Sequence, residues 1–144
     1  MRLRRMLLGL LLLPIYAASV RADAFDDQFV AGLNERRLFA LSEAHCRRRL
    51  ADAQLGDVDR ADATIALCRT LVEHALNTPR SQREPIWQAA EAAAEDFRRA
   101  APSSARRVLV DLHHALAVVA RGELARQEAE LGAPGAPSLE EARR

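Results

Sequence analysis

The stretch FDDQFVAGLNERRLFALSEAHCRRRL, residues 25–50, decides the fold. Its apolar residues recur at intervals of three and four, which is the spacing of one helix face rather than the alternation of a strand. The pattern predicts a helix over Asp26–Arg36, a tight turn at Arg37 and Leu38, and a second helix over Phe39–Ala53. The residues expected to face inward are Phe25, Phe29, Val30 and Leu33, then Phe39, Ser42, Cys46 and Leu50.

The helical period continues along the rest of the chain. It predicts a third helix over Asp59–Asn77, a fourth ending at Ala101, a fifth beginning near Ser103 or Ser104, and a short sixth over Leu124–Leu131. The expected inward residues are Ala61, Ile65, Cys68, Val72, Ala75 and Leu76 in the third, Ile86, Trp87, Ala90, Ala93, Ala94 and Phe97 in the fourth, and Val108, Leu112, Ala115, Leu116 and Val119 in the fifth. The sequence therefore predicts an all-α protein of antiparallel helices.

Signals for helix ends accompany this pattern. Ser81 and Glu84 have the spacing of a capping box, and Pro85 is tolerated in a first helical turn. Arg121 and Gly122 are expected to form the turn between the fifth and sixth helices.

Residues 1–22 have the three parts of a secretory signal: three arginines, the apolar run Met6–Ile15, and Val20-Arg21-Ala22 at the exit. We expect cleavage after Ala22 and export to the periplasm or the extracellular space, without stable membrane insertion. The alternative is an uncleaved N-terminal anchor. The apolar run is shorter than the roughly 20 residues that cross a bilayer.

The mature chain after such cleavage would be weakly acidic. All 21 basic residues are arginine, and four of them lie within residues 1–22. The remaining chain has 17 arginines and 20 acidic residues, a formal charge of −3. This balance lacks the basic footprint of a nucleic-acid-binding protein, and no nucleic-acid partner is expected. About 122 residues suffice for one modest domain, expected over residues 23–131, with a flexible tail over residues 132–144.

The first two helices resemble a tetratricopeptide repeat. Phe29, Val30 and Leu33 match the large–small–large pattern of a repeat's first helix. The inward residues of the second predicted helix match the pattern of a repeat's second helix. The ending Ala93, Phe97, Ala100 and Pro102 and the Gly122 turn are also similar to repeat features. The resemblance covers about residues 25–131. It implies helix pairs stacked in a right-handed array whose first helices line a groove for a peptide or protein partner.

The match also has departures. Arg37 stands where a turn glycine is usual, Val30 is bulkier than usual, and the pairs start near residues 25, 59 and 104, so that one spacing is stretched. The array is therefore degenerate, and a six-helix bundle is the alternative. Polar residues expected in the groove are Asn34, Arg37 and His113.

Catalytic and metal motifs are not found in the sequence. The four histidines fall in no metal-binding motif, and the adjacent His113 and His114 point about 100° apart on a helix. No phosphate loop or nucleophile motif is present. We therefore expect no enzymatic activity, no cofactor and no metal; the alternative function is an exported bundle that binds a small ligand or metal.

Two further expectations concern the cysteines and the tail. Cys46 and Cys68 are expected to lie at about the same level on consecutive antiparallel helices, which makes a disulfide between them feasible. The alternative is that both are small buried residues of the core. Ser138-Leu139-Glu140-Glu141 forms a second capping box with little chain behind it. This favours an origin in a longer repeat array, with a frayed polar tail as the alternative.

Overall fold

The computed structural model describes residues 26–132 and Glu141. A helical segment over residues 26–35 is followed by α2 (Phe39–Leu50), α3 (Asp57–Leu76), a 3-10 turn η1 (Arg80–Gln82), α4 (Glu84–Ala100) and α5 (Arg107–Glu130). No strand occurs in these described ranges, and the predicted all-α class is confirmed. The predicted signal segment and nearly all of the predicted tail lie outside the described residues.

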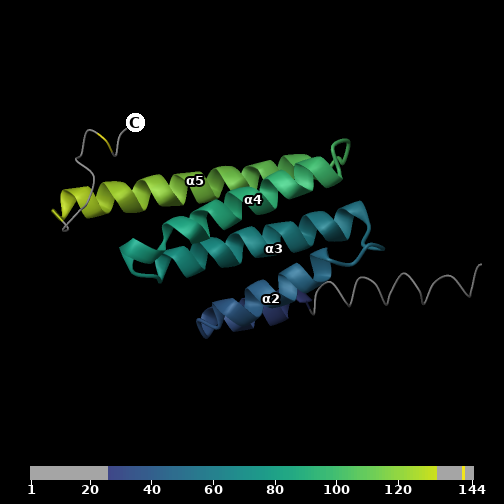
Figure 1. Ribbon diagram of the computed structural model, residues 1–144, viewed down its shortest axis with the longest axis horizontal. Coiled ribbons are helices and arrows are strands. Elements are labelled where there is room, and N and C mark those ends of the chain that lie inside the picture. The colour runs from purple at the N-terminus through teal and green to yellow at the C-terminus, as the bar shows by residue number, and fades with distance from the viewer. Residues whose placement is uncertain (1–25, 133–140, 142–144) are drawn as a thin grey trace, which may run out of the picture.

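The helices run back and forth, with α3 between α2 and α4 (Figure 1), and α5 packs against both α3 and α4. Contacts join α3 to α2, α4 and α5, and join α4 to α5, whereas the backbones of α2 and α4, both fully described, have no Cα atoms within 8 Å of each other. Helix α3 is thus the centre of the molecule. Its buried residues cover a broad side of the helix rather than a narrow stripe: Ala61, Ala63, Thr64, Leu67, Cys68, Thr70, Leu71 and Ala75.

Two apolar clusters form the core. The first joins the segment 26–35 to α2, α3 and α4 through Val30, Cys46, Leu67, Leu71 and Ala90. The second joins α3, α4 and α5 through Ala61, Ala94, Phe97, Ala101 and Val110. Trp87 is also buried, so the prediction that this ring packs in the core is confirmed.

The first predicted turn forms, with an unusual residue at its centre. Arg37 has a φ of +57°, the left-handed conformation that favours glycine. Its amide donates to Asn34 O at 2.8 Å, and the amide of Leu38 donates to Leu33 O at 2.9 Å. These two bonds are those of a Schellman helix end. The sequence places Arg37 where the resemblance expects a glycine, and the backbone there has the shape that a glycine would adopt most easily.

The prediction of a sixth helix is wrong, because α5 continues through Arg121 and Gly122 to Glu130. A single glycine inside a helix costs only about 1 kcal/mol relative to alanine. Ion pairs support the distal half of α5: Arg121 pairs with Glu84 at 2.7 Å, and Arg83 pairs with Glu128. Packing against the start of α4 therefore outweighs the weak break.

The predicted inner stripe of the fifth helix is also wrong. Val108, Leu112, Leu116 and Val119 are each more than half exposed, and Ala115 is exposed as well. The buried residues of α5 are Val110 and Ala117. Ten of the thirteen residues from Val108 to Ala120 are apolar, so periodicity alone cannot choose between two apolar faces. The small Ala117 and the compact Val110 let α5 approach its neighbours closely, and that face is the one buried.

The predicted caps differ as well. The residue before α4 is Arg83, and no side-chain hydrogen bond caps this helix, so the Ser81–Glu84 capping box does not form; Pro85 does lie in the first turn. Ser104 accepts a hydrogen bond from the amide of Arg106 at 3.3 Å but lies outside α5, which begins at Arg107. No helix in the described ranges has the length and apolarity for crossing a membrane.

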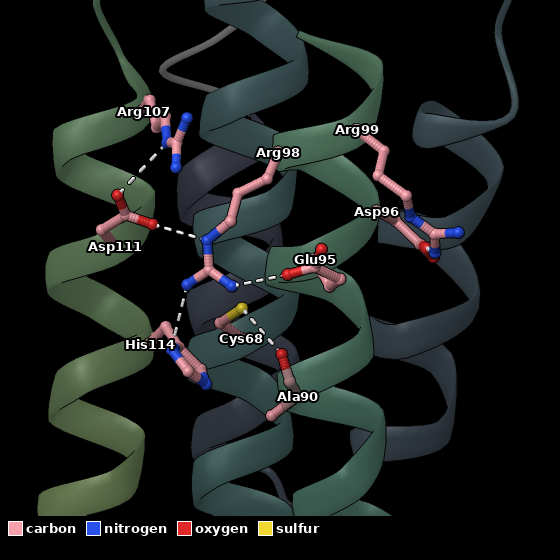
Figure 2. Close-up of polar contacts among 9 residues, drawn as sticks. All are labelled: Cys68, Ala90, Glu95, Asp96, Arg98, Arg99, Arg107, Asp111 and His114. Carbon is pink, nitrogen blue, oxygen red and sulfur yellow. Dashed lines mark hydrogen bonds and ion pairs between the residues drawn. The ribbon is translucent and has the colours of Figure 1, made fainter. Parts of the chain in front are cut away.

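A polar network fixes α5 against α4 (Figure 2). Arg98 of α4 donates from Nε to Asp111 at 2.8 Å and from Nη2 to His114 Nδ1 at 3.2 Å, while Nη1 donates to Glu95 at 2.9 Å. The hydrogen bond from Arg98 holds the pKa of Asp111 below its usual range. Figure 2 shows the neighbouring Arg99 pointing away from α5, where it pairs with Asp96 of its own helix.

Arg98→Ala is expected to lower the free energy of unfolding by about 1 kcal/mol, since it removes hydrogen bonds between two helices, one of them to a carboxylate. Arg99→Ala, which removes a solvent-exposed pair within one helix, is expected to change it by less than about 0.5 kcal/mol. Because the pKa of Asp111 is lowered on folding, its contribution is present above pH 3.8 and is lost as the pH falls below that value. Urea unfolding of both variants at neutral and acidic pH measures this. Equal losses for Arg98→Ala and Arg99→Ala would contradict it.

Candidate functional site

Two clefts flank the exposed edge of α3. The larger, of about 450 Å³, lies between the segment 26–35 and α3; we call it the acidic cleft. The smaller, of about 210 Å³, lies between α3 and α5; we call it the His113 cleft. Arg69 and Glu73 of α3 line both, so the two clefts are the two sides of one ridge. The lining of the acidic cleft is completed by Asp27, Gln28, Val30, Ala31, Asn34, Glu35 and Ala66.

The ridge stands out because the middle of α3 is otherwise buried or half-buried. Between Arg60 and Ala75, Arg69 is the one exposed residue. Glu73 follows it by one helical turn and is therefore on the same side of the helix. Arg69 and Glu73, on the exposed side of this central helix, are well placed to contact a molecule that lies across residues 26–35, α3 and α5.

Two of the three residues predicted to line a groove do line these clefts. Asn34 lies in the acidic cleft, and His113 lies in the His113 cleft beside Val72, Leu116 and Ala117. Burial lowers the pKa of His113, and the charge of Arg69 lowers it further, so its imidazole is neutral at pH 7. The third residue, Arg37, lines neither cleft; it occupies the turn after residue 35.

The charges of the acidic cleft are largely uncompensated. Asp27, Glu35 and Glu73 supply three carboxylates and Arg69 a single guanidinium. Among the described residues, none of these four side chains forms an ion pair with another. This differs from the rest of the surface, where pairs such as Arg126–Glu123 and Arg47–Glu43 are frequent.

Asn34 connects this cleft to a buried hydrogen-bond chain. Its Nδ2 donates to Thr70 Oγ1 at 3.0 Å, and the hydroxyls of Thr70 and Ser42 are bonded to each other at 2.9 Å. Asn34 is 8% exposed, and its Oδ1 has no hydrogen-bond partner in the described part of the chain. Of the two polar atoms of this amide, only Nδ2 is therefore hydrogen-bonded within the described residues.

Sequence reasoning missed Arg69, Glu73, Glu35 and Asp27. The signal available for Arg69 and Glu73 was their spacing of four on a helix whose neighbouring residues are apolar or small. For Glu35 and Asp27, which lie on a short helix with many polar residues, the sequence gives no distinguishing signal.

A third cavity, the alanine groove, lies on α2, α3 and α4. It has a volume of about 460 Å³ and forms where α2 and α4 stand apart across α3. Its lining consists of Arg47, Leu50, Ala51, Arg60, Thr64, Leu67, Ala89, Ala92, Ala93, Asp96, Phe97 and Ala100. Its charged groups are already engaged. Arg60 donates to carbonyls at the end of α2 and in the loop that follows, and Arg47 and Asp96 pair with neighbours on their own helices.

No arrangement for a metal is present in the described ranges, where no group of three or more histidine, cysteine, aspartate or glutamate side chains is placed to hold an ion. His114 binds Arg98, and His74 pairs with Glu43 at 2.7 Å and stacks on Phe39.

Cys46 and Cys68 are both free thiols in the structure, and each is 1% exposed. Burial raises the pKa of each thiol to about 11, and the Cys68 thiol contacts Ala90 O at 3.7 Å. The nearby Cys46 also raises the pKa of Cys68. The disulfide between them stays a prediction.

The reduced native protein is expected to resist iodoacetamide at pH 8, because a pKa near 11 instead of 9.0 lowers the thiolate fraction about 100-fold and burial blocks access. Unfolding in urea should release both thiols. Since the folded protein retains protons that the unfolded chain loses, its stability should fall as the pH rises from 9 to about 11. Mass spectrometry of labelled peptides measures this. Rapid labelling of the native protein would contradict the burial, and peptide mapping without reductant tests the Cys46–Cys68 bridge.

Comparison of the chain with protein-family models, with curated proteins and with solved structures finds no match.

Proposed function

We propose that the protein is an exported, non-enzymatic scaffold that binds an extended peptide or protein segment across the face formed by residues 26–35, α3 and α5. The observation that carries this is the pair of clefts on either side of the Arg69–Glu73 ridge. An extended segment laid across these three helices can use both clefts at once.

The helix packing supports a repeat-like reading of this face. If the segment 26–35 and α2 form one pair and α3 and α4 the next, α5 is the first helix of a third pair. The contact of α3 with α5 is then a contact between first helices, and the backbones of the second helices, α2 and α4, stand apart. This agrees with the tetratricopeptide-like arrangement that the sequence resembles, in which first helices line the binding groove.

Export is the second part of the proposal and rests on the signal-like residues 1–22. Intact-mass measurement of protein recovered from the producing cell tests it. A mature chain that starts at Asp23 is expected, and retention of Met1–Ala22 would favour the membrane-anchored alternative.

Selection from a displayed library of random peptides tests the binding face. Peptides enriched on the mature protein should lose about tenfold or more in affinity when Arg69 or His113 is replaced by alanine, because these residues lie in the clefts. Arg99→Ala on the far side of α4 is the matched control and should leave affinity unchanged. Circular dichroism establishes that each variant is folded. Failure to enrich any peptide, or equal affinity for all three variants, would reject this face as the binding site.

The alanine groove favours a second function, binding of a small apolar ligand within the helical domain. Its floor of Leu50, Leu67, Phe97 and alanines suits such a ligand, and its volume lies within the range of ligand pockets. Binding of an environment-sensitive apolar dye that is lost in Ala93→Leu, which fills the groove, but not in Arg69→Ala would favour this function. No change with Ala93→Leu would exclude the groove.

A further inference from the structure

The outer face of α5 is apolar and exposed. Val108, Leu112, Ala115, Leu116 and Val119 recur at the spacing of one helix face, and we call this face the α5 stripe. Its four large residues are between 52% and 71% exposed, although α5 packs on its other side against α3 and α4. Single exposed leucines are common on protein surfaces, whereas a continuous apolar face is typical of an interaction site.

The centre of the α5 stripe carries no formal charge. Between Leu112 and Ala120 the helix has no arginine, aspartate or glutamate. Asp111, just before this range, is bonded to Arg98 of α4 on the inner side of the helix. An occupant of the stripe must therefore be apolar along its centre.

Segments of the chain outside the described range do not supply such an occupant. Within residues 133–144, Leu139 is the one leucine, isoleucine, valine, methionine or aromatic residue, and a single large side chain cannot cover four. The apolar run Met6–Ile15 is expected to be removed with the signal. The stripe is therefore left to another chain.

A second copy of the stripe matches the first when the two helices run antiparallel. A two-fold axis midway between Leu112 and Ala115 brings Leu112 of each copy beside Ala115 of the other, and Val108 beside Val119 of the other. The large leucine then lies against the small alanine, as close helix packing requires. Each contact occurs twice, as in any two-fold interface.

The charges at the two ends of the stripe favour the same orientation. In an antiparallel pair, Glu123 of one copy lies toward the start of α5 in the other, where Arg106, Arg107 and the helix dipole are all positive. A parallel pair would instead place Arg107 beside Arg107 and Glu123 beside Glu123, and like charges repel.

We propose that the α5 stripe is the contact of a two-fold dimer in which α5 of two copies packs antiparallel. From Val108 to Val119 the stripe is about 17 Å long, at about 1.5 Å per residue. A helix pair of this length buries less than the roughly 1,200 Å² of a standard interface, so the dimer is weak, with a dissociation constant on the order of 10 µM.

Dimerisation goes beyond the proposed function and requires no peptide, but it affects where the clefts lie. Leu116 belongs to the α5 stripe and also lines the His113 cleft. Because two antiparallel helices turn the same flank to the same side, the His113 clefts of both copies would lie next to each other on one side of the dimer.

Sedimentation of the mature protein over about 1–100 µM tests the dimer. We expect the average mass to rise from that of one copy toward that of two. Leu112→Glu should weaken dimerisation about 100-fold or more and leave a monomer over this range, because two carboxylates would be buried without a partner. Leu41→Glu on α2 is the matched control, since Leu41 is 58% exposed and lies outside the stripe; it should dimerise as the unchanged protein does. Circular dichroism establishes that both variants are folded.

Cross-linking tests the orientation. A mixture of Val108→Cys and Val119→Cys proteins should be joined by a short bismaleimide, whereas neither protein should be joined to itself, because its two introduced thiols would lie more than about 15 Å apart. The native Cys46 and Cys68 are each 1% exposed and do not compete. Cross-linking of either protein to itself would overturn the antiparallel pair. An unchanged protein that stays monomeric throughout the range, or equal weakening by Leu112→Glu and Leu41→Glu, would overturn the dimer.

Discussion

Phe97→Ala is expected to lower the free energy of unfolding by about 3–5 kcal/mol, the range measured for removal of a buried aromatic ring. Phe97 is 2% exposed and joins α3, α4 and α5 in the second core cluster. Three of its four cluster partners, Ala61, Ala94 and Ala101, are alanines. Alanine has no side chain that can swing into the space left by the ring, so the cavity should persist.

A loss of this size is a large part of the total stability of a domain of this length, about 5–15 kcal/mol. Urea unfolding followed by circular dichroism measures it. Leu112→Ala on the exposed face of α5 is the control, and it should cost less than about 1 kcal/mol because Leu112 is 53% exposed. If Phe97→Ala costs no more than Leu112→Ala, either the burial of Phe97 of α4 in the second core cluster or the exposure of Leu112 on the outer face of α5 is wrong.

The contrast between these two residues shows what periodicity can and cannot determine. In the fourth helix, the predicted residues Trp87, Ala90, Ala94 and Phe97 are buried, because polar residues between them leave one apolar face. In the fifth helix the predicted face is exposed, because apolar residues continue around the helix and the choice depends on which face fits against α3 and α4. Sequence spacing carries no information on that fit.

The candidate site, like the faces of the helices, was only partly predictable from the sequence. Asn34 and His113 follow from the resemblance, which assigns polar residues of first helices to a groove. Arg69 and Glu73 become distinctive only once α3 is known to be buried on its other sides. The acidic cleft combines residues from positions 27 to 73, and the approach of α3 to the first helical segment is a tertiary contact that no local pattern encodes.

The buried hydrogen-bond chain of Ser42, Thr70 and Asn34 is a second place where one substitution should have a large effect. Ser42 was predicted to face inward, and it does; its partner Thr70, which is fully buried on α3, was not predicted. Thr70 accepts from Asn34 at 3.0 Å and bonds Ser42 at 2.9 Å, so that one hydroxyl ties the segment 26–35, α2 and α3 together.

Thr70→Val keeps the shape of the side chain but removes this hydroxyl, and it is expected to cost about 2–4 kcal/mol. The Nδ2 of Asn34 and the hydroxyl of Ser42 would both lose a partner inside the protein, where water does not replace it. Thr64→Val is the matched control on the same helix. Thr64 is equally buried, but its hydroxyl bonds only the carbonyl of Arg60 at 2.8 Å, so its loss should cost less than about 1 kcal/mol.

A double-mutant cycle separates the hydrogen-bond chain from simple packing. Adding Ser42→Ala to Thr70→Val removes one of the two unsatisfied groups, so the double variant should be more stable than the sum of the single losses by about 0.5–3 kcal/mol. Additive losses for Ser42→Ala and Thr70→Val would mean that the two hydroxyls act independently. Equal losses for Thr70→Val and Thr64→Val would mean that the chain from Asn34 to Ser42 contributes nothing beyond side-chain volume. In the second case the hydrogen bond from Asn34 to Thr70 would also contribute nothing to stability.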